Sequence, residues 1–287
     1  MDGGVLAGER GSYHAAMSTK IHPTAVIDPA CEIGEGCDIG PFCVLTGKVV
    51  LGENVRLVSH VTMQGPVTVG NGSIFYPGSA IGFPPQDLKF KLGHATAGVV
   101  IGADNMIREG VTIHASTKPD IPTRTGDRCF LMALSHMGHD ACIGNDVTMV
   151  NAVLLAGHVK VADKVTLGGN AAVHQFCRIG RLAFVGGLVA MSMDVPPFCI
   201  SGARNTIHGL NVVGLRRNGV DRKDITNLRR AFRDVFRARL PRPEMVALLK
   251  EIAKESPIVN EWVEFVEATG TRSIAAASGG DNDDDRD

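Results

Sequence analysis

Hydrophobic residues recur at every sixth position along most of this chain. Between Thr125 and Met191 every step residue after the initial Thr is aliphatic or Met, and the same step fits Ile21 to Ile81 and then Ile101 to Ile113. Neither the 3.6-residue period of an α-helix nor the period of two of a strand gives this spacing. A hexapeptide repeat does, because each unit lays a short strand and a turn on one side of a prism and points its hydrophobic residue inward.

The other positions of the hexad agree with such a prism. Small residues such as Cys31, Cys37 and Cys43 follow at the fifth position of many units, and glycine is common at the second. Hexads of this composition resemble the left-handed parallel β-helix of hexapeptide acyltransferases. The handedness rests on that resemblance, since parallel crossovers are otherwise nearly always right-handed. We predict an all-β solenoid of this kind, followed by a small α-helical C-terminal domain.

Breaks in the step give the domain boundaries. The interval from Ile81 to Ile101 exceeds three hexads by two positions, so residues 83–98 are predicted to leave the prism wall as an extruded loop. The stretch 115–124 keeps the count but contains Pro119 and Pro122, which weaken its strand character. We predict a disordered N-terminal extension at 1–20, the β-helix at 21–200, the helical domain at 201–274 and a disordered acidic tail at 275–287.

The C-terminal segment has helix signals and a marked basic charge. Helices are predicted over Asp221–Ala238, Pro241–Glu255 and Pro257–Thr269, the last two with Pro in the first turn. From Arg216 to Arg242 nine Arg and one Lys stand against three Asp, a local charge of +7. A solvated helix face is one interpretation. A docking patch for an acidic partner is the interpretation that we favour.

Charge and cysteine content indicate the cellular compartment and the kinds of partner to expect. The formal net charge is −1, but residues 281–287 hold five Asp and one Arg, a charge of −4, so the first 280 residues carry +3. Seven Cys without metal-like spacing indicate a reduced, cytoplasmic compartment. The chain has no apolar run long enough to span a bilayer and no signal-peptide pattern at its start. We therefore expect no integral membrane segment and no nucleic-acid partner.

Four histidines in the second half of the solenoid are candidates for chemistry. None of His136, His139, His158 and His174 falls at an inward hexad position. Since a coil is about 18 residues, the spacings of 19 and 16 residues between the last three place them near one edge on successive coils. Three imidazoles could bind zinc. The pair His139-Asp140 equally suits a general base oriented by a carboxylate, so both interpretations stay open at this point.

A set of motifs carries a resemblance to one family. The chain resembles the UDP-N-acetylglucosamine 3-O-acyltransferases from about Ile21 to Ile274. The motifs are Gln86-Asp87-Leu88-Lys89, Ile107-Arg108-Glu109, Thr112-Ile113-His114, His136-Met137-Gly138-His139-Asp140, Ala156-Gly157-His158, Val173-His174-Gln175-Phe176, Asp194-Val195-Pro196-Pro197 and Gly214-Leu215-Arg216-Arg217.

This resemblance implies an enzyme that moves a 3-hydroxyacyl group from acyl carrier protein to the 3-hydroxyl of UDP-N-acetylglucosamine, the first step of lipid A biosynthesis. His139 matches the general base, Asp140 its orienting carboxylate, and the Gly157 N–H the oxyanion hole. Gly157 could also simply serve the turn. Gly187 matches the position that measures acyl-chain length. The residues that match substrate-binding positions are Asp87, Lys89, His136, His158, His174, Gln175, Asn211 and Arg217.

The resemblance also implies a homotrimer with active sites between subunits, an acidic carrier docked on the basic helices, and no cofactor or metal. Ser135, Val213 and Asn218 depart from the family pattern and put nucleotide affinity in doubt. Two alternatives are a zinc protein like the γ-carbonic anhydrases and an acyltransferase for a different UDP-amino sugar. An N-acyltransferase of the same pathway is disfavoured, because the coils begin at Ile21 and leave no room for its uridine-binding domain. Acyl-chain length is not predicted.

Overall fold

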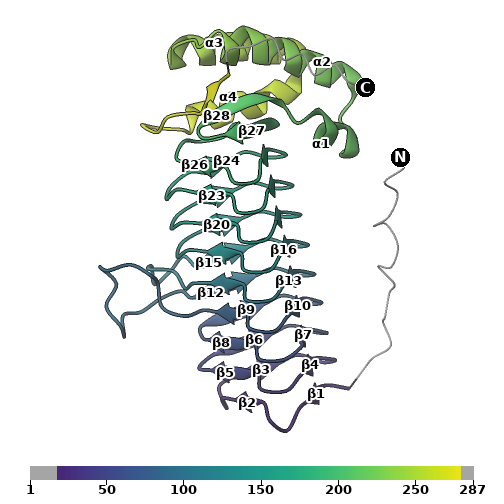
Figure 1. Ribbon diagram of the computed structural model, residues 1–287, viewed down its shortest axis with the longest axis vertical. Helices are drawn as coiled ribbons and strands as arrows, with labels where there is room; N and C mark the ends of the chain where they lie inside the picture. Colours follow the sequence, from purple (N-terminus) through teal and green to yellow (C-terminus); the bar gives the residue numbers. More distant parts are fainter. Residues whose placement is uncertain (1–17, 279–287) are drawn as a thin grey trace.

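The computed structural model describes residues 18–278, and these form a tall three-sided prism capped by helices at its C-terminal end (Figure 1). The first side, sheet A, is built from β1 (Lys20–Ile21), β4 (Asp38–Ile39), β7 (Arg56–Leu57), β10 (Ile74–Phe75), β13 (Met106–Ile107), β16 (Phe130–Leu131), β19 (Thr148–Met149), β22 (Thr166–Leu167) and β25 (Phe184–Val185).

The other two sides have the same organisation. Sheet B contains β2 (Val26–Ile27), β5 (Val44–Thr46), β8 (Thr62–Gln64), β11 (Ala80–Ile81), β14 (Thr112–Ile113), β17 (His136–Met137), β20 (Leu154–Leu155), β23 (Ala172–Val173) and β26 (Ala190–Met191). Sheet C contains β3 (Glu32–Ile33), β6 (Val49–Leu51), β9 (Val67–Val69), β12 (Val99–Ile101), β15 (Thr123–Thr125), β18 (Cys142–Ile143), β21 (Lys160–Val161) and β24 (Arg178–Ile179).

Each strand pairs in parallel with the strand three further along the chain, so one turn of the solenoid takes one strand from every sheet. The register that pairs Lys20 with Asp38 has the length of three hexads, and the same step is repeated along most of the prism. The step from Ile74 to Met106 is longer, because this turn includes the segment between β11 and β12. That segment has no strand and projects from the side of the prism (Figure 1). The predicted parallel β-solenoid of hexapeptide repeats is confirmed.

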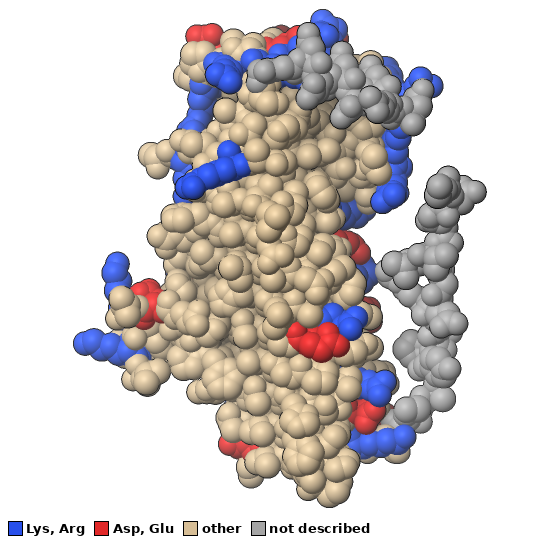
Figure 2. Space-filling model, viewed as in Figure 1, with Lys and Arg blue, Asp and Glu red and all other residues tan. Residues whose placement is uncertain are grey.

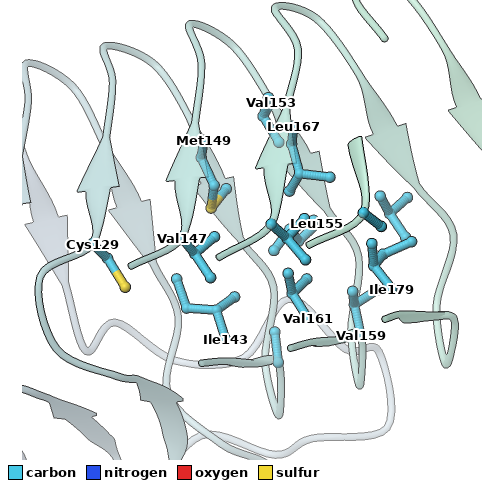
Figure 3. Packing of buried hydrophobic residues seen from close by; sticks show 14 of the residues in the cluster. Cys129, Ile143, Val147, Met149, Val153, Leu155, Val159, Val161, Leu167 and Ile179 are labelled. Carbon is cyan, nitrogen blue, oxygen red and sulfur yellow. The ribbon is translucent and has the colours of Figure 1, made fainter. Parts of the chain in front are cut away.

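The core is a column of the hexad step residues. Met149, Leu155 and Val161 are nearly or fully buried and come from the three sheets of one turn, and Leu167 follows Met149 on sheet A one turn later. Figure 3 shows them in a shared interior together with valines such as Val147 from the fifth hexad position. Because each turn buries its hydrophobic residues only against its neighbours, the column extends along the axis without widening.

The corners of the prism use left-handed backbone conformations. Asp140, His158 and Phe176 have φ of 60°, 63° and 67° and occupy the same corner on three successive turns. Non-glycine residues seldom adopt positive φ, although Asp and His do so more readily than most. This corner lies directly after the strands of sheet B, and it carries much of the site described below.

Above the last turn the chain changes architecture. The antiparallel hairpin of β27 (Cys199–Ala203) and β28 (Thr206–Leu210) extends sheet A, and the sequence pattern missed it. The helices follow: α1 (Val212–Arg217), α2 (Arg222–Ala231) continued by the π-helical η1 (Phe232–Arg237), α3 (Arg242–Glu255), the 3₁₀ turn η2 (Pro257–Val259) and α4 (Asn260–Glu267). No helix in residues 18–278 is long and apolar enough to cross a membrane.

A buried ionic cluster joins the helices to the prism. Asp194 is fully buried and accepts hydrogen bonds from Arg178 Nε at 2.8 Å and Arg272 Nε at 3.1 Å. Arg178 also donates to Phe265 O in α4, and Trp262 Nε1 donates to Pro197 O at 2.8 Å. Since Asp194 is buried and bonded to both arginines, these bonds fix the helical cap on the last turn.

The structure corrects two predicted boundaries. The predicted tail 275–287 begins too early, because β29 (Ala276–Ala277) pairs with β28 and both Ala275 and Ala277 are only 3% exposed. Small alanines fit closely against the hairpin, which composition alone did not indicate. The predicted extension 1–20 ends too late, because Lys20 already pairs with Asp38. Residues 1–17 and 279–287, on which the rest of both predictions falls, lie outside the described residues.

Candidate active site

His139 and Asp140 form a hydrogen-bonded pair at the corner after β17. The distance from His139 Nδ1 to Asp140 Oδ2 is 2.7 Å, and the two side chains are 13% and 4% exposed. The positive φ of Asp140 turns its carboxylate back towards the imidazole of the preceding residue. An imidazole held through Nδ1 in this way presents Nε2 to its surroundings as a proton acceptor.

Hydrogen bonds from the neighbouring turn fix the carboxylate of Asp140. Ser116 Oγ donates to Oδ1 at 2.6 Å and Thr117 Oγ1 to Oδ2 at 2.7 Å, while the Asp140 N–H donates to Thr123 Oγ1 at 2.8 Å. Burial by itself raises the pKa of Asp140, but the hydrogen bonds from Ser116, His139 and Thr117 outweigh burial and hold that pKa below its usual value. The carboxylate is therefore ionised and immobile, and sequence reasoning had not identified Ser116, Thr117 or Thr123.

His158 lies one turn above this pair at the same corner as Asp140. Its ring meets that of His139 edge-on with centroids 5.1 Å apart, and it stacks on Phe176 of the next turn at 4.5 Å. Burial lowers the pKa of His158, and the Asp140 carboxylate, with an oxygen 3.6 Å from Nε2, opposes that effect without cancelling it. His158 is therefore neutral, and its ring covers one side of the His139–Asp140 pair.

Gly157 makes room for the catalytic candidate. A Cβ at this position would lie 2.6 Å from His139 Cε1 and 2.7 Å from His139 Nε2, closer than real Cβ contacts come. Gly157 does not have a positive φ, so the turn itself does not demand glycine here. Of the two interpretations open at the sequence level, a glycine that simply serves the turn loses its basis. The close approach of the imidazole is what requires it.

His136 lies on β17, three residues before His139. His136 Nδ1 is hydrogen-bonded to Thr112 Oγ1 at 2.7 Å, and the His136 ring meets that of His114 at 5.4 Å. Burial lowers the pKa of His136 to about 4, with smaller contributions from His114 and His139. At neutral pH this imidazole is uncharged and offers Nε2 for hydrogen bonding.

A groove of about 580 Å³ runs along sheet B from these histidines towards the helical cap. Its floor is apolar, made by residues of β20, β23 and β26 such as Leu154, Ala172 and Ala190. His174 and Gln175 line it one turn above His158. Gln86 from the projecting segment and Arg204 from the β27–β28 turn also line it, and sequence reasoning had selected neither.

The projecting segment is anchored beside the groove. His114 Nδ1 donates to Pro84 O at 2.8 Å, and Ala115 N donates to Phe83 O at 2.9 Å. The carboxylate of Asp87 accepts from Lys89 N at 2.9 Å and so stabilises the turn of the loop. Neither Asp87 nor Lys89 lines the groove of the single chain.

Three other predicted residues lie away from the groove. Asn211 caps α1 through Gly214 N at 2.9 Å and donates to Leu182 O at 2.9 Å, so both ends of its amide are used. Arg217 is exposed in the last turn of α1. A Cβ on Gly187 would lie 3.3 Å from Gly169 O, so a side chain at this exposed corner requires a shift of a few tenths of an ångström.

The three departures from the family pattern are placed as follows. Ser135 is fully buried with its Oγ facing the core, without a hydrogen-bond partner among the described residues, so it does not contact the groove. Val213 is exposed on α1, and Asn218 ends that helix with its Nδ2 donating to Gly214 O.

The hypothesis of a zinc site can be tested against the side chains that could ligate a metal. Within residues 18–278, the metal-ligating side chains that gather are those of His139, Asp140 and His158, with ligand atoms within 4.8 Å of one another. His174 is not among them, although its spacing suggested that it would be. Both Asp140 oxygens already accept short hydrogen bonds, including that from His139, so this group fits a zinc ion poorly.

Comparisons with known proteins agree with this geometry. Residues 194–275 match the family model described as UDP-N-acetylglucosamine O-acyltransferase, domain 2, and residues 18–47 match the bacterial transferase hexapeptide repeat. A Synechocystis protein named acyl-(acyl carrier protein)–UDP-N-acetylglucosamine O-acyltransferase is 46% identical over 79% of this chain and 82% of its own length. An Agrobacterium fabrum protein of the same name is 40% identical over 92% of this chain and 98% of its own length.

Solved structures give the same result. The UDP-N-acetylglucosamine acyltransferase of Francisella novicida superposes with a TM-score of 0.84 at 36% identity, covering 92% of this chain and 95% of that one. The corresponding enzyme of Moraxella catarrhalis superposes with a TM-score of 0.84 at 34% identity, covering 89% and 99%.

Proposed function

This chain belongs to the UDP-N-acetylglucosamine O-acyltransferase family, and on that premise we propose that it moves a 3-hydroxyacyl group from acyl carrier protein to the 3-hydroxyl of UDP-N-acetylglucosamine. The reaction is the first step of lipid A biosynthesis, and we place it in the cytoplasm, where the seven free cysteines stay reduced. The observation that carries the proposal is the His139–Asp140 pair at one end of an apolar groove.

His139 is the general base of the proposed reaction. A sugar hydroxyl is a poor nucleophile at neutral pH, so its proton must leave as it attacks the thioester. The bond from Asp140 to Nδ1 leaves Nε2 of His139 free to accept that proton. General-base catalysis by a positioned histidine typically contributes about 10²–10⁴-fold. The same imidazolium can return the proton to the departing carrier thiolate.

Gly157 is the proposed donor to the oxyanion. Attack on the thioester carbonyl gives a tetrahedral intermediate whose negative oxygen needs an N–H group nearby. The Gly157 N–H donates to no acceptor among the described residues, and its backbone lies against the His139 ring. Base and donor are therefore adjacent, as one reacting carbonyl carbon requires.

The sugar nucleotide is proposed to bind at the histidine end of the groove. His136, His174 and Gln175 line it there. His158 packs against the ring of His139, and Asp87 and Lys89 come from the loop beside the groove. Arg217 is proposed to meet the diphosphate from a neighbouring copy, with Asn211 holding the helix that carries it. This arrangement is consistent with a homotrimer whose active sites lie between subunits.

The acyl chain is proposed to lie along the apolar floor of the groove. Leu154, Ala172 and Ala190 offer it a surface without polar groups. Gly187 is the proposed limit of chain length, because a side chain added at its exposed corner would shorten the available path. The acidic carrier is proposed to dock on the basic helices of the cap.

A transfer assay tests the proposal. Purified protein is given UDP-N-acetylglucosamine and 3-hydroxyacyl carrier proteins of several lengths, beside His139→Ala and the 3-amino analogue of the sugar. We expect O-acyl transfer that falls by at least about 10²-fold in the variant. Transfer that survives His139→Ala contradicts the proposed base. Transfer to the amino sugar alone contradicts the proposed acceptor, and no transfer from any donor contradicts the proposed reaction.

A further inference from the structure

A small hollow between α1 and α2 is lined by arginines. Its volume is about 260 Å³, and Arg216, Arg222 and Arg229 surround it together with Val220, Ile225 and Thr226. Figure 2 shows Lys and Arg gathered around the helical end of the molecule, whereas the middle of the same face has few charged residues. Three guanidinium groups around one hollow make a site for carboxylates or another multiply charged anion.

Two of the three acidic residues of this region are hydrogen-bonded away from Arg216 and Arg222. Asp234 pairs with Arg230 and Arg233, and Asp221 accepts from Lys223 N at the start of α2. For Arg216 and Arg222 no acidic partner is found within residues 18–278. Because like charges close together repel, the positions of Arg216 and Arg222 beside one hollow favour an anionic partner.

β29 is directed towards α1, which borders this hollow. β29 runs parallel to β28, with Thr206 opposite Ala276 and Ile207 opposite Ala277, and Ser278 N donates to Ile207 O at 2.8 Å. A chain continuing in that direction follows β28 towards Leu210 and then α1. Residues 281–285 are three to seven positions beyond Ser278, a reach of roughly 10–25 Å at about 3.3–3.6 Å per residue. The way from Ile207 to Arg216 is roughly 16–20 Å by the rises of strand and helix.

We propose that the acidic segment Asp281–Asp287 of this chain docks in the arginine-lined hollow between α1 and α2. Its charge of −4 complements the local charge of +7 between Arg216 and Arg242, and glycines at 279 and 280 join it to the last strand. Carboxylates close to the hollow bind there in preference to free anions, because the chain holds them at an effective concentration in the millimolar range.

The docked segment limits access to the basic surface. On the proposed function, an acidic carrier protein uses the same helices, so this segment competes with the carrier and weakens its binding. The competition is electrostatic and therefore declines as salt shortens the screening length to about 3 Å at 1 M. The enzyme would then respond to carrier concentration less steeply than a chain without the acidic segment.

A peptide-binding experiment tests the docking without any need for activity. A fluorescent peptide of residues 279–287 is titrated into the full-length protein and into a full-length variant in which all five Asp of the segment are changed to Asn. We expect the variant to bind the peptide at least about tenfold more tightly, because its own segment no longer competes. A peptide with Asn for every Asp is the matched control.

The site is located by a second pair of variants in the neutralised chain. Arg216→Ser with Arg222→Ser is expected to weaken peptide binding by about tenfold or more, and Arg56→Ser at the far end of sheet A to leave it unchanged. Circular dichroism verifies that all variants fold. Equal peptide binding by wild type and neutralised chain overturns the docking. So does an equal loss with Arg56→Ser, since the interaction would then depend on overall charge.

The consequence for the carrier is measured separately. At low salt, neutralising the segment is expected to lower KM for the acyl carrier protein by about threefold to tenfold, with kcat and KM for the sugar nucleotide unchanged. An unchanged carrier KM beside normal peptide binding overturns the competition but not the docking. Absence of any transfer overturns the proposed function and leaves the peptide result to decide the docking.

Discussion

The imidazole of His139 lies against the backbone of the next turn, where Gly157 has no side chain to obstruct it. The fixed carboxylate of Asp140 holds the ring from the other side, through 2.7 Å to Nδ1. The position of the base is thus determined by one missing Cβ and one hydrogen bond. Both are local features that single substitutions can change.

Gly157→Ala is expected to reduce transfer by about 10²-fold, because a Cβ 2.6 Å from His139 Cε1 must displace the ring, and a displacement of about 1 Å can have an effect of that size. The measurement is kcat/KM, with circular dichroism to verify folding. Gly169→Ala is the matched control: it occupies the same hexad position two units later, and its Cβ would come no closer than 3.6 Å to any neighbour. Equal losses in both variants would contradict the argument.

The lowered pKa of His136 predicts that the folded protein becomes less stable in acid. This pKa is lowered to about 4 in the folded protein from 6.5, so between these values the unfolded chain binds more protons and stability falls as pH falls. The full pKa shift corresponds to about 3 kcal/mol of the free energy of unfolding, and the partial exposure of His136 reduces this contribution to about 1–2 kcal/mol. We expect urea midpoints to fall from pH 6.5 to 4 and His136→Gln to flatten that slope. An unchanged slope would show that His136 is not the group responsible.

Sequence reasoning at this scale succeeded where residues are adjacent and failed where contact comes from folding. The pairing of His139 with Asp140 was predicted, because neighbours in sequence stay neighbours. Ser116 and Thr117 reach Asp140 from a different turn of the solenoid, and no spacing rule indicated them. Ser135 was noted as a departure from the family pattern, and its fifth hexad position turns it into the core.

At the scale of elements, the strands of the prism could be predicted because the sequence repeats. Every turn of the prism reuses one pattern of inward residues, so the strands could be placed from the step alone. The hairpin of β27 and β28 and the short helix α1 have no such period. Elements this short give too little pattern to distinguish strand from helix, and their conformations depend on packing against the last turn.

The junction of prism and cap depends on the ionic cluster of Asp194. Asp194→Ala leaves Arg178 and Arg272 without their buried carboxylate, and we expect it to lower the free energy of unfolding by about 3–5 kcal/mol. Asp38→Ala is the control, since its ion pair with Arg56 is solvent-exposed and contributes less than about 1 kcal/mol. Urea denaturation of both variants measures the difference. Similar small effects would show that the cluster does not hold the cap.

At the scale of the whole molecule, one side of the prism has an unusual outer surface. On sheet A the outward residues of six successive strands lie in register and form a ladder. Four of them are large and apolar, namely Ile74, Met106, Phe130 and Phe184, and the other two are Thr148 and Thr166. The outward residues of sheet C in the same turns include Arg124, Lys160 and Arg178. Large apolar side chains that are only partly buried on an outer face favour an interface there, whereas the charged side suits solvent. The ladder is thus where the proposed homotrimer would pack.

Phe130→Asp tests that assembly, because it places a charge in the middle of the ladder, where burial without a partner is unfavourable by several kcal/mol. We expect light scattering to shift from the mass of three copies to the 30.4 kDa of one, and transfer to be lost with it, since the proposed active sites lie between copies. Thr68→Asp on sheet C is the control and should keep both the assembly and the activity, because its side is exposed. A Phe130→Asp protein that stays assembled would exclude sheet A as the interface. One that becomes monomeric and remains active would show that each chain contains a complete site.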